Sequence, residues 1–267
     1  MSGFRGPTVC AVTPDELRDA YDDQLRTDDG SFQDGFTPWI VKLRYPQDGP
    51  DAAAVEFAYH QLARHAGIRV PAARLLTTPS DRFFAVERFD RAAGTRIHML
   101  SLSGLLDLPQ IYFAAEYGEV GRLIASLCES YAETTEFARR MVFSVLAHNR
   151  DDHLKNTALL MNADGTWRLA PAYDLTFMRG PGGEHSMLVA GEGRPCFRSV
   201  REDLLWRPPD SEQSHWILGR TLDGEDHQGG ERLCRHACGG HATTQSRVGR
   251  VTTVVRYLRE RVTITIP

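Results

Sequence analysis

The sequence has no apolar run of about 18 residues, the length that a membrane-spanning helix needs. Its first residues, MSGFRGPTVCAV, lack the long apolar core of a secretory signal peptide. Five cysteines scattered over 267 residues are too few for a disulfide-stapled scaffold. We therefore expect a cytoplasmic protein in a reducing environment, with no membrane contact.

The sequence also lacks an excess of charge of either sign. Its 31 Lys and Arg residues against 35 Asp and Glu residues give a net charge of −4 and a pI of about 6.2. A chain without a basic excess is not expected to bind nucleic acid directly. Its 42% hydrophobic and 25% charged residues are typical of a soluble globular protein of one large domain or two small lobes.

The first ninety residues predict a small sheet with one packed helix. Apolar, β-branched or aromatic runs predict strands at 39–43 and 83–89, and a turn at Val70 and Pro71 leads to the segment 74–76. A helix is expected between Asp51, as its N-cap, and Gly67, because apolar residues recur there at helical spacing. A further helix candidate lies earlier, at 14–25. We expect residues 1–90 to form an N-terminal lobe.

From about Ser101 the sequence becomes helical. Apolar stripes predict helices at 120–131 and 134–148. A β-hairpin is expected over 156–161 and 167–169, with Asp164 and Gly165 at its turn. Residues 91–206 are therefore expected to form a helical C-terminal lobe, and the fold class is α+β with two lobes. No fold is predicted for the tail, 207–267.

The stretch HNRDDHLKN, 148–156, carries the strongest chemical signal. Four residues separate Asp151 from Asn156, the spacing of the catalytic loop in eukaryotic-type kinases. There the Asp accepts the proton of the attacking hydroxyl and the Asn holds a metal ion on the phosphates. Asp174 follows the predicted hairpin, where kinases place their second metal-binding carboxylate. The pattern thus predicts Asp151 as the base and a magnesium pair of Asn156 and Asp174.

The N-terminal lobe offers matching groups for a nucleotide. Lys42 lies within a predicted strand and can reach the α- and β-phosphates of ATP, while Glu56 on the next helix can position it. The backbone at Glu87 to Phe89 would contact adenine, and Asp90 could reach the ribose. Lys42, Glu56, Asp151 and Asp174 stand in the order that kinases use.

Each residue also has a plainer interpretation. Asp151 alone could cap a helix end, Asp174 could occupy a turn, and Lys42 and Glu56 could be solvated surface residues. The cluster of His148, Asp151, Asp152 and His153 also permits a metal-dependent hydrolase, although no second group of ligands is evident in the sequence.

Several segments together resemble the HipA family, the Ser/Thr protein kinases that act as toxins in bacterial toxin–antitoxin pairs. They are AVERFDR (85–91), RIH (96–98), NRDDHLKN (149–156), LAPAYDLT (169–176), GGEH (182–185) and VAGEG (189–193). The resemblance covers roughly 38–206. It implies a two-lobed kinase fold that uses ATP and Mg²⁺.

Carried onto single residues, the resemblance supports the same assignments. It implies Asp151 as the base, Asn156 and Asp174 as magnesium ligands, and Lys42 as the phosphate-binding lysine. Glu87 and Phe89 would form the adenine hinge, and His153 and Lys155 would line the cleft. It also implies a HipB-like DNA-binding antitoxin as partner, and a protein substrate such as an aminoacyl-tRNA synthetase of the translation machinery.

Two segments depart from the family pattern. The family's Gly-rich loop, which covers the phosphates, has at best a remnant at 2–7, so weak nucleotide binding and impaired activity are expected. After Trp206 the sequence turns rich in His, Gly, Arg and Cys, which suggests a reading-frame change and a degraded copy. Cys234, His236, Cys238 and His241 permit a zinc interpretation of this tail, but their spacing is imperfect.

Two further functions remain open. The Asp-x4-Asn spacing is shared with small-molecule kinases of the aminoglycoside phosphotransferase kind, although their motif lacks strings such as VERFD and PAYDL. Alternatively, the chain could be a catalytically dead fragment that only binds a partner.

Overall fold

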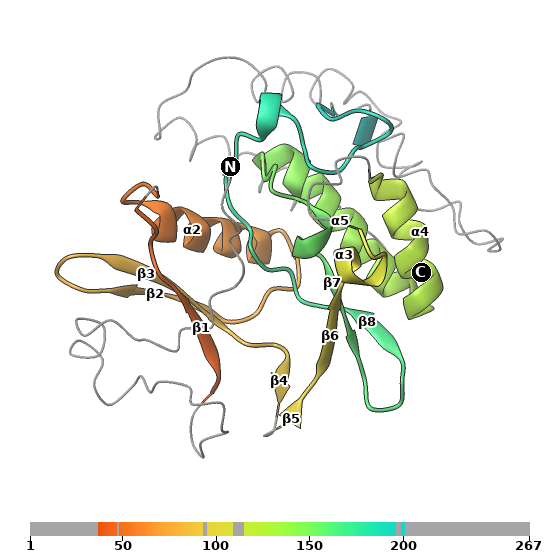
Figure 1. Ribbon diagram of the computed structural model, residues 1–267, viewed down its shortest axis with the longest axis horizontal. Helices are drawn as coiled ribbons and strands as arrows, with labels where there is room; N and C mark the ends of the chain where they lie inside the picture. The colour runs from red at the N-terminus through yellow and green to blue at the C-terminus, as the bar shows by residue number, and fades with distance from the viewer. Residues whose placement is uncertain (1–36, 47, 93–94, 109–114, 196–198, 201–267) are drawn as a thin grey trace.

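A computed structural model describes residues 37–46, 48–92, 95–108, 115–195 and 199–200. The helix expected at 14–25, the remnant of the Gly-rich loop and the tail after Trp206 all lie outside these residues. The described part runs from a small sheet with one helix into a helical region that carries a second sheet (Figure 1).

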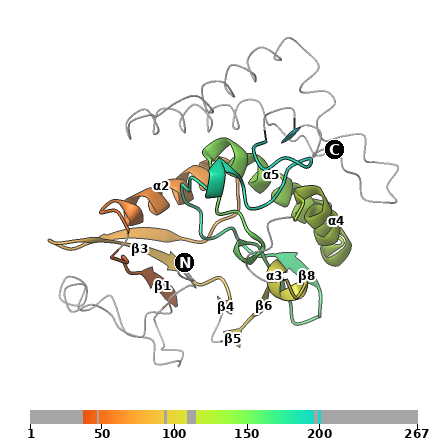
Figure 2. The same ribbon diagram turned by 45° about the horizontal axis from the view of Figure 1, so that its top comes forward.

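The first sheet is antiparallel and three-stranded, in the order β1-β3-β2. Its strands are β1 (Trp39–Lys42), β2 (Ala73–Thr77) and β3 (Arg82–Glu87). Helix α2 (Ala52–His65) packs against the sheet, as both views show (Figures 1 and 2). The predicted sheet and helix are thus confirmed. The Asp51 side chain makes no cap bond, however, and pairs with Arg82 instead.

The predicted strand 83–89 ends earlier, at Glu87. The chain leaves the first sheet there and forms a two-stranded ribbon of β4 (Arg91–Ala92) and β5 (Thr95–Arg96). The backbone N–H of Ile97 then donates to the carbonyl of Asp90 at 2.9 Å, which closes this ribbon.

The helical region contains α3 (Leu102–Leu105), α4 (Tyr117–Cys128) and α5 (Tyr131–Ala147). Both long helices were predicted, but each begins three residues earlier than its apolar stripe indicates. Neither N-cap side chain, Glu116 or Ser130, makes a capping hydrogen bond. Glu116 is not a preferred N-cap residue, whereas Ser130 is one that the apolar stripe alone does not indicate.

The second sheet contains the predicted hairpin. Strands β7 (Ala158–Met161) and β8 (Trp167–Leu169) pair around a turn in which Gly165 adopts a φ of 86°. Strand β6 (His98–Ser101) adds to β7 and was not predicted. Asn156 lies in the short 3₁₀ helix η1 (Leu154–Asn156) before the hairpin, not in its first strand. A second 3₁₀ turn, η2 (Pro181–Gly183), follows.

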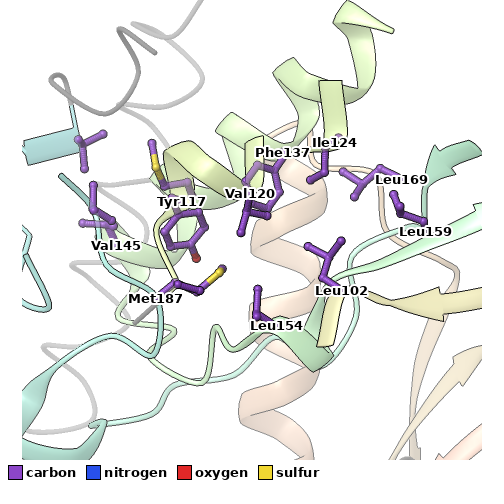
Figure 3. Close-up of a cluster of buried hydrophobic side chains, with 14 residues drawn as sticks. Leu102, Tyr117, Val120, Ile124, Phe137, Val145, Leu154, Leu159, Leu169 and Met187 are labelled. Carbon is purple, nitrogen blue, oxygen red and sulfur yellow. The ribbon is translucent and has the colours of Figure 1, made fainter. Parts of the chain in front are cut away.

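Two apolar clusters hold these parts together. The larger joins α4 and α5 to η1 and the second sheet, with Leu102, Ile124, Phe137, Leu159 and Leu169 at its centre (Figure 3). The second joins Tyr59 and Ala63 of α2 to Phe143 and Ala147 of α5. Helix α2 therefore packs against both the first sheet and α5. None of the described helices is long and apolar enough to cross a membrane.

Candidate active site

Lys42, the last residue of β1, lies between two carboxylates. Its Nζ hydrogen-bonds to Oε1 of Glu56, on α2, and to Oδ1 of Asp174, which follows the second sheet. The same ammonium lies 5.9 Å from the ring centroid of Phe84, its antiparallel partner on β3. Three residues predicted from separate parts of the sequence thus meet at one point.

The charges of this cluster alter each other's protonation. Burial alone would lower the pKa of Lys42, but Glu56 and Asp174 outweigh it and hold the pKa above its ordinary value. Lys42 therefore stays positively charged. Burial raises the pKa of Glu56 to about 7, although Lys42 pulls it down. Glu56 can accordingly change charge near neutral pH.

The predicted catalytic loop starts where α5 ends. His148 adopts a left-handed φ of 55° after the helix, and the N–H of Asn149 donates to the carbonyl of Ser144 at 2.9 Å. This closing bond turns the chain sharply out of the helix. The Asn149 side chain is buried, and its Oδ1 accepts the N–H of Thr176 at 3.5 Å. Asn149 thus joins the loop to the segment after Asp174.

Asp151, His153 and Asn156 lie together in this loop. The Oδ1 of Asp151 is 3.6 Å from Nε2 of His153. The Nδ2 of Asn156 donates to the backbone carbonyl of Asp151 at 2.8 Å. This bond fixes the amide orientation and leaves Oδ1 of Asn156 as the atom suited to a cation.

Asp174 sits in a strained backbone conformation. Its φ is 58°, in the left-handed region that non-glycine residues rarely occupy. Such strain often marks a functional position. Its neighbour Tyr173 packs its ring 5.7 Å from that of Phe89, between centroids, and so joins the expected adenine hinge to Asp174.

The hinge residues have defined partners. The N–H of Glu87 donates to the carbonyl of Ala72 at 2.9 Å, so contact with adenine through Glu87 would have to use its carbonyl. The carboxylate of Asp90 pairs with Arg88 and Arg91. A ribose at Asp90 would compete with these two guanidinium groups. The adenine contact at Glu87 and the ribose contact at Asp90 both stay predictions.

Asp152, which sequence reasoning considered only as a hydrolase ligand, is a buried junction. Its carboxylate accepts hydrogen bonds from the Tyr117 hydroxyl and the Ser186 N–H and lies against Nδ1 of His185, each at 2.8 Å. It therefore ties the loop to α4 and to the GGEH segment. The sequence held one indication of this junction: His185 belongs to the GGEH segment that resembles the family, although no role was assigned to it.

The structure does not gather the four residues of the hydrolase alternative. His148 contacts Arg150, whereas Asp152 faces Tyr117 and His185. Within the described ranges, no three His, Cys, Asp or Glu side chains are placed to share a metal ion. The zinc interpretation of the tail lies outside those ranges.

A comparison with known protein families gives a decisive match. The sequence model of the HipA-like C-terminal domain matches residues 12–220, most of the chain. This chain belongs to the HipA family. The family resemblance carried by NRDDHLKN and LAPAYDLT is thereby confirmed.

Curated relatives of this HipA-family chain carry kinase names. It is 32% identical over 151 residues to a protein of Sinorhizobium fredii named "Putative kinase Y4dM", covering 51% of this chain and 36% of the relative. It is 25% identical over 189 residues to a protein of Haemophilus influenzae named "Putative kinase". That match covers 65% of this chain and 51% of the relative. The chain thus spans about a third to a half of these relatives.

Among solved structures, the fold is similar to a HipA of Shewanella oneidensis MR-1, which was determined with HipB and its operator DNA. The TM-score is 0.53 at 16% identity, and the match covers 86% of this chain and 64% of that one. At this identity the likeness concerns the fold, which is mixed α/β with small antiparallel sheets, as the α+β expectation requires.

Proposed function

We propose that this HipA-family chain is a kinase that transfers the γ-phosphoryl group of ATP to a hydroxyl, with magnesium as cofactor. The observation that carries the proposal is the bridge that Lys42 forms between Glu56 and Asp174. Kinases need a strand lysine on the α- and β-phosphates, a helix glutamate to hold it and a metal-binding aspartate beside them. Here Lys42 contacts both carboxylates.

In the proposed reaction the substrate hydroxyl oxygen bonds to the γ-phosphorus. The bond from that phosphorus to the β–γ bridging oxygen breaks, and ADP leaves. Asp151 takes the proton of the hydroxyl as the general base. His153 lies 3.6 Å from the Asp151 carboxylate, so it lines the place where the hydroxyl would enter. Lys155, in the same loop, would line the cleft beside it.

The oxygen donors fit magnesium, a hard cation that prefers carboxylate and carbonyl ligands. Asn156 would offer Oδ1, because its Nδ2 is already engaged by the loop backbone. Asp174 would offer Oδ2, because Lys42 occupies Oδ1. Bound there, magnesium would supply positive charge that neutralises the phosphate groups. Adenine would lie against the backbone of Glu87 and Phe89.

We further propose that the acceptor is a Ser or Thr of a protein, such as an aminoacyl-tRNA synthetase, and that the kinase acts as a cytoplasmic toxin. The HipA of Shewanella oneidensis was solved with HipB, which supports a HipB-like antitoxin as partner. The alternatives are a small-molecule kinase and an inactive fragment. Weak nucleotide binding, expected from the missing Gly-rich loop, stays a prediction.

The test is an autophosphorylation and ATPase assay of the full chain with magnesium, compared with its Asp151→Asn variant. Label transfer that requires both magnesium and Asp151 is expected. If the folded chain binds ATP but never transfers phosphate to itself, to a protein or to an aminoglycoside, it is the inactive fragment. Transfer to aminoglycosides without transfer to protein would select the small-molecule kinase.

A further inference from the structure

A cluster of charged residues lies apart from the Lys42 bridge, where the end of α2 meets α5. It contains Arg69, in the connection from α2 to β2, and four residues of α5: Glu133, Glu136, Arg139 and Arg140. Glu136 and Arg140 are buried, at 6% and 8% exposure. Removing charged groups from water is costly, and their pairing often only offsets that cost. Stability alone therefore does not account for this buried cluster.

Arg69 is the centre of this cluster. Its guanidinium binds Glu133 through two parallel bonds, of 3.0 Å from Nη1 to Oε1 and 2.6 Å from Nη2 to Oε2. Its backbone N–H donates to Oε1 of Glu136 at 2.9 Å, and the same oxygen accepts Nε of Arg140 at 3.0 Å. The connection after α2 is thereby fixed to α5.

The cluster also holds the backbone that leads from β8 to Asp174. Glu133 accepts the N–H of Leu169 at 2.9 Å, and Arg69 donates to the carbonyl of Leu169 at 3.1 Å. Arg140 donates to the carbonyl of Ala170 at 2.8 Å. The N–H of Ala172, two residues before Asp174, donates to the carbonyl of Arg69 at 2.8 Å.

Four backbone groups of residues 169–172 thus depend on Arg69, Glu133 and Arg140. Asp174 follows at once in a left-handed conformation, which the chain holds only if the flanking residues are fixed. The same Arg69 stands just beyond the helix that carries Glu56. Arg69 therefore follows the helix that carries Glu56 and bonds directly to the segment that leads to Asp174.

We propose that Arg69, together with Glu133, is a positioning residue that sets the Asp174 carboxylate for magnesium and Lys42. The proposal rests on the proposed kinase function. Apolar side chains could pack the same junction at similar stability, but they could not hydrogen-bond the N–H and carbonyl of Leu169 and the carbonyl of Ala170. Partners that orient a metal ligand typically contribute about 10- to 100-fold to metal affinity.

The experiment uses Arg69→Ala, which removes the guanidinium but keeps both backbone bonds of residue 69. We expect the magnesium-dependent affinity for ATP to fall about 10- to 100-fold, with KM for MgATP rising more than kcat falls. The matched control is Arg44→Ala, which removes the exposed Arg44–Asp81 pair and should leave both constants unchanged.

A double-mutant cycle separates positioning from mere stabilisation. In an Asp174→Asn background the ligand is already impaired, so Arg69→Ala should cause no further loss of magnesium dependence. Additive losses, or a folded Arg69→Ala variant with unchanged magnesium dependence, would overturn the proposal. If Arg69→Ala does not fold, Glu133→Gln, which keeps the shape of the side chain, takes its place.

Amide hydrogen exchange keeps this test separate from the kinase proposal. In Arg69→Ala the peptide 169–176 should exchange faster than in the parent chain, whether or not nucleotide binds. If the parent chain binds no ATP, the kinase proposal fails and exchange alone decides the positioning role. Unchanged protection of 169–176 would then overturn it.

Discussion

Tyr173 donates a hydrogen bond from its hydroxyl to the carbonyl oxygen of Lys155, at 2.5 Å. The bond joins the segment that carries Asp174 to the loop that carries Asp151 and Asn156. It is one direct tie between the segments that carry the two proposed magnesium ligands, and the contact of Asn149 with Thr176 is another.

Tyr173→Phe should therefore weaken magnesium-dependent ATP binding without unfolding the chain. A lost neutral hydrogen bond costs about 1 kcal/mol, or roughly fivefold in affinity. Burial, and then the Asp174 carboxylate, raise the pKa of Tyr173, so its hydroxyl remains a donor and the effect should not vary between pH 6 and 9. Calorimetric titration of MgATP at several pH values measures it, and equal affinities would refute the tie.

Asp151→Asn should abolish transfer while leaving the fold intact. A positioned general base contributes about 10²- to 10⁴-fold to the rate, and Asn cannot accept the proton. Single-turnover kinetics measure the loss, with the melting temperature as the check on folding. A folded variant with nearly full activity would show that another group is the base.

Asp174→Ala and Asp174→Gly should differ in stability but not in function. Both lose the carboxylate, so magnesium should no longer strengthen ATP binding in either variant. Glycine accepts the left-handed φ of 58° freely, whereas alanine does not, so the Gly variant should be about 1 kcal/mol more stable. Urea unfolding tests the order, and an Ala variant as stable as the Gly variant would contradict the backbone argument.

Glu56 should make nucleotide binding pH-dependent. Its pKa of about 7 in the folded chain lies above the ordinary 4.5, so Glu56 gains a proton as pH falls through 7. A neutral Glu56 holds Lys42 less well, and ATP affinity should fall by at most about tenfold per pH unit below 7. The same proton uptake favours the folded state, and this stabilisation is lost as pH rises through 7.

These two opposite trends are checked together. ATP affinity should decline from pH 8 to 6 while this group's contribution to the melting temperature of the free chain grows. Glu56→Gln is the control, because it cannot titrate and should flatten both profiles. Parent and Glu56→Gln profiles that remain parallel would rule out Glu56 as the group responsible.

Asp152→Ala should destabilise the chain strongly, unlike the same change at its neighbour Asp151. Asp152 is 5% exposed and has partners on α4 and in the GGEH segment. Removing one member of a buried charged network typically costs about 3–5 kcal/mol. Urea unfolding of the two variants gives the comparison. Similar losses of unfolding free energy at both positions would mean that the buried contacts of Asp152 do not stabilise the fold.

Local patterns accounted for much of this architecture. The apolar strand runs, the helical stripe around Glu56 and the Asp-Gly turn each depend on neighbouring residues, so sequence alone places them well. The Asp-x4-Asn spacing predicted one loop, and in the structure Asn156 does bond to the backbone of Asp151. The order of the motifs predicted that Glu56 positions Lys42, whereas the contact of Lys42 with Asp174 is a finding of the structure.

Long-range relationships were beyond local patterns. Nothing near β6 indicates that it pairs with β7, some sixty residues later along the chain. Asp151 and Asp152 are chemically alike in the sequence, and only their burial separates a loop carboxylate from a structural junction. No local pattern singles out Arg69 or Glu133, because the backbone groups that they bond lie far away in the sequence.

Helix α2 is anchored to the first sheet on one side and to α5 on the other, and this limits how far Glu56 could move. Its His60 ring lies 5.8 Å from that of Phe84 in the first sheet, between centroids. Its Tyr59 hydroxyl donates to the carbonyl of Ala147, the last residue of α5, at 2.5 Å. A helix so anchored cannot swing outward without breaking both contacts. Glu56 is therefore held beside Lys42, and if the chain is the proposed kinase, its control would act by blocking entry to the site rather than by moving Glu56 away.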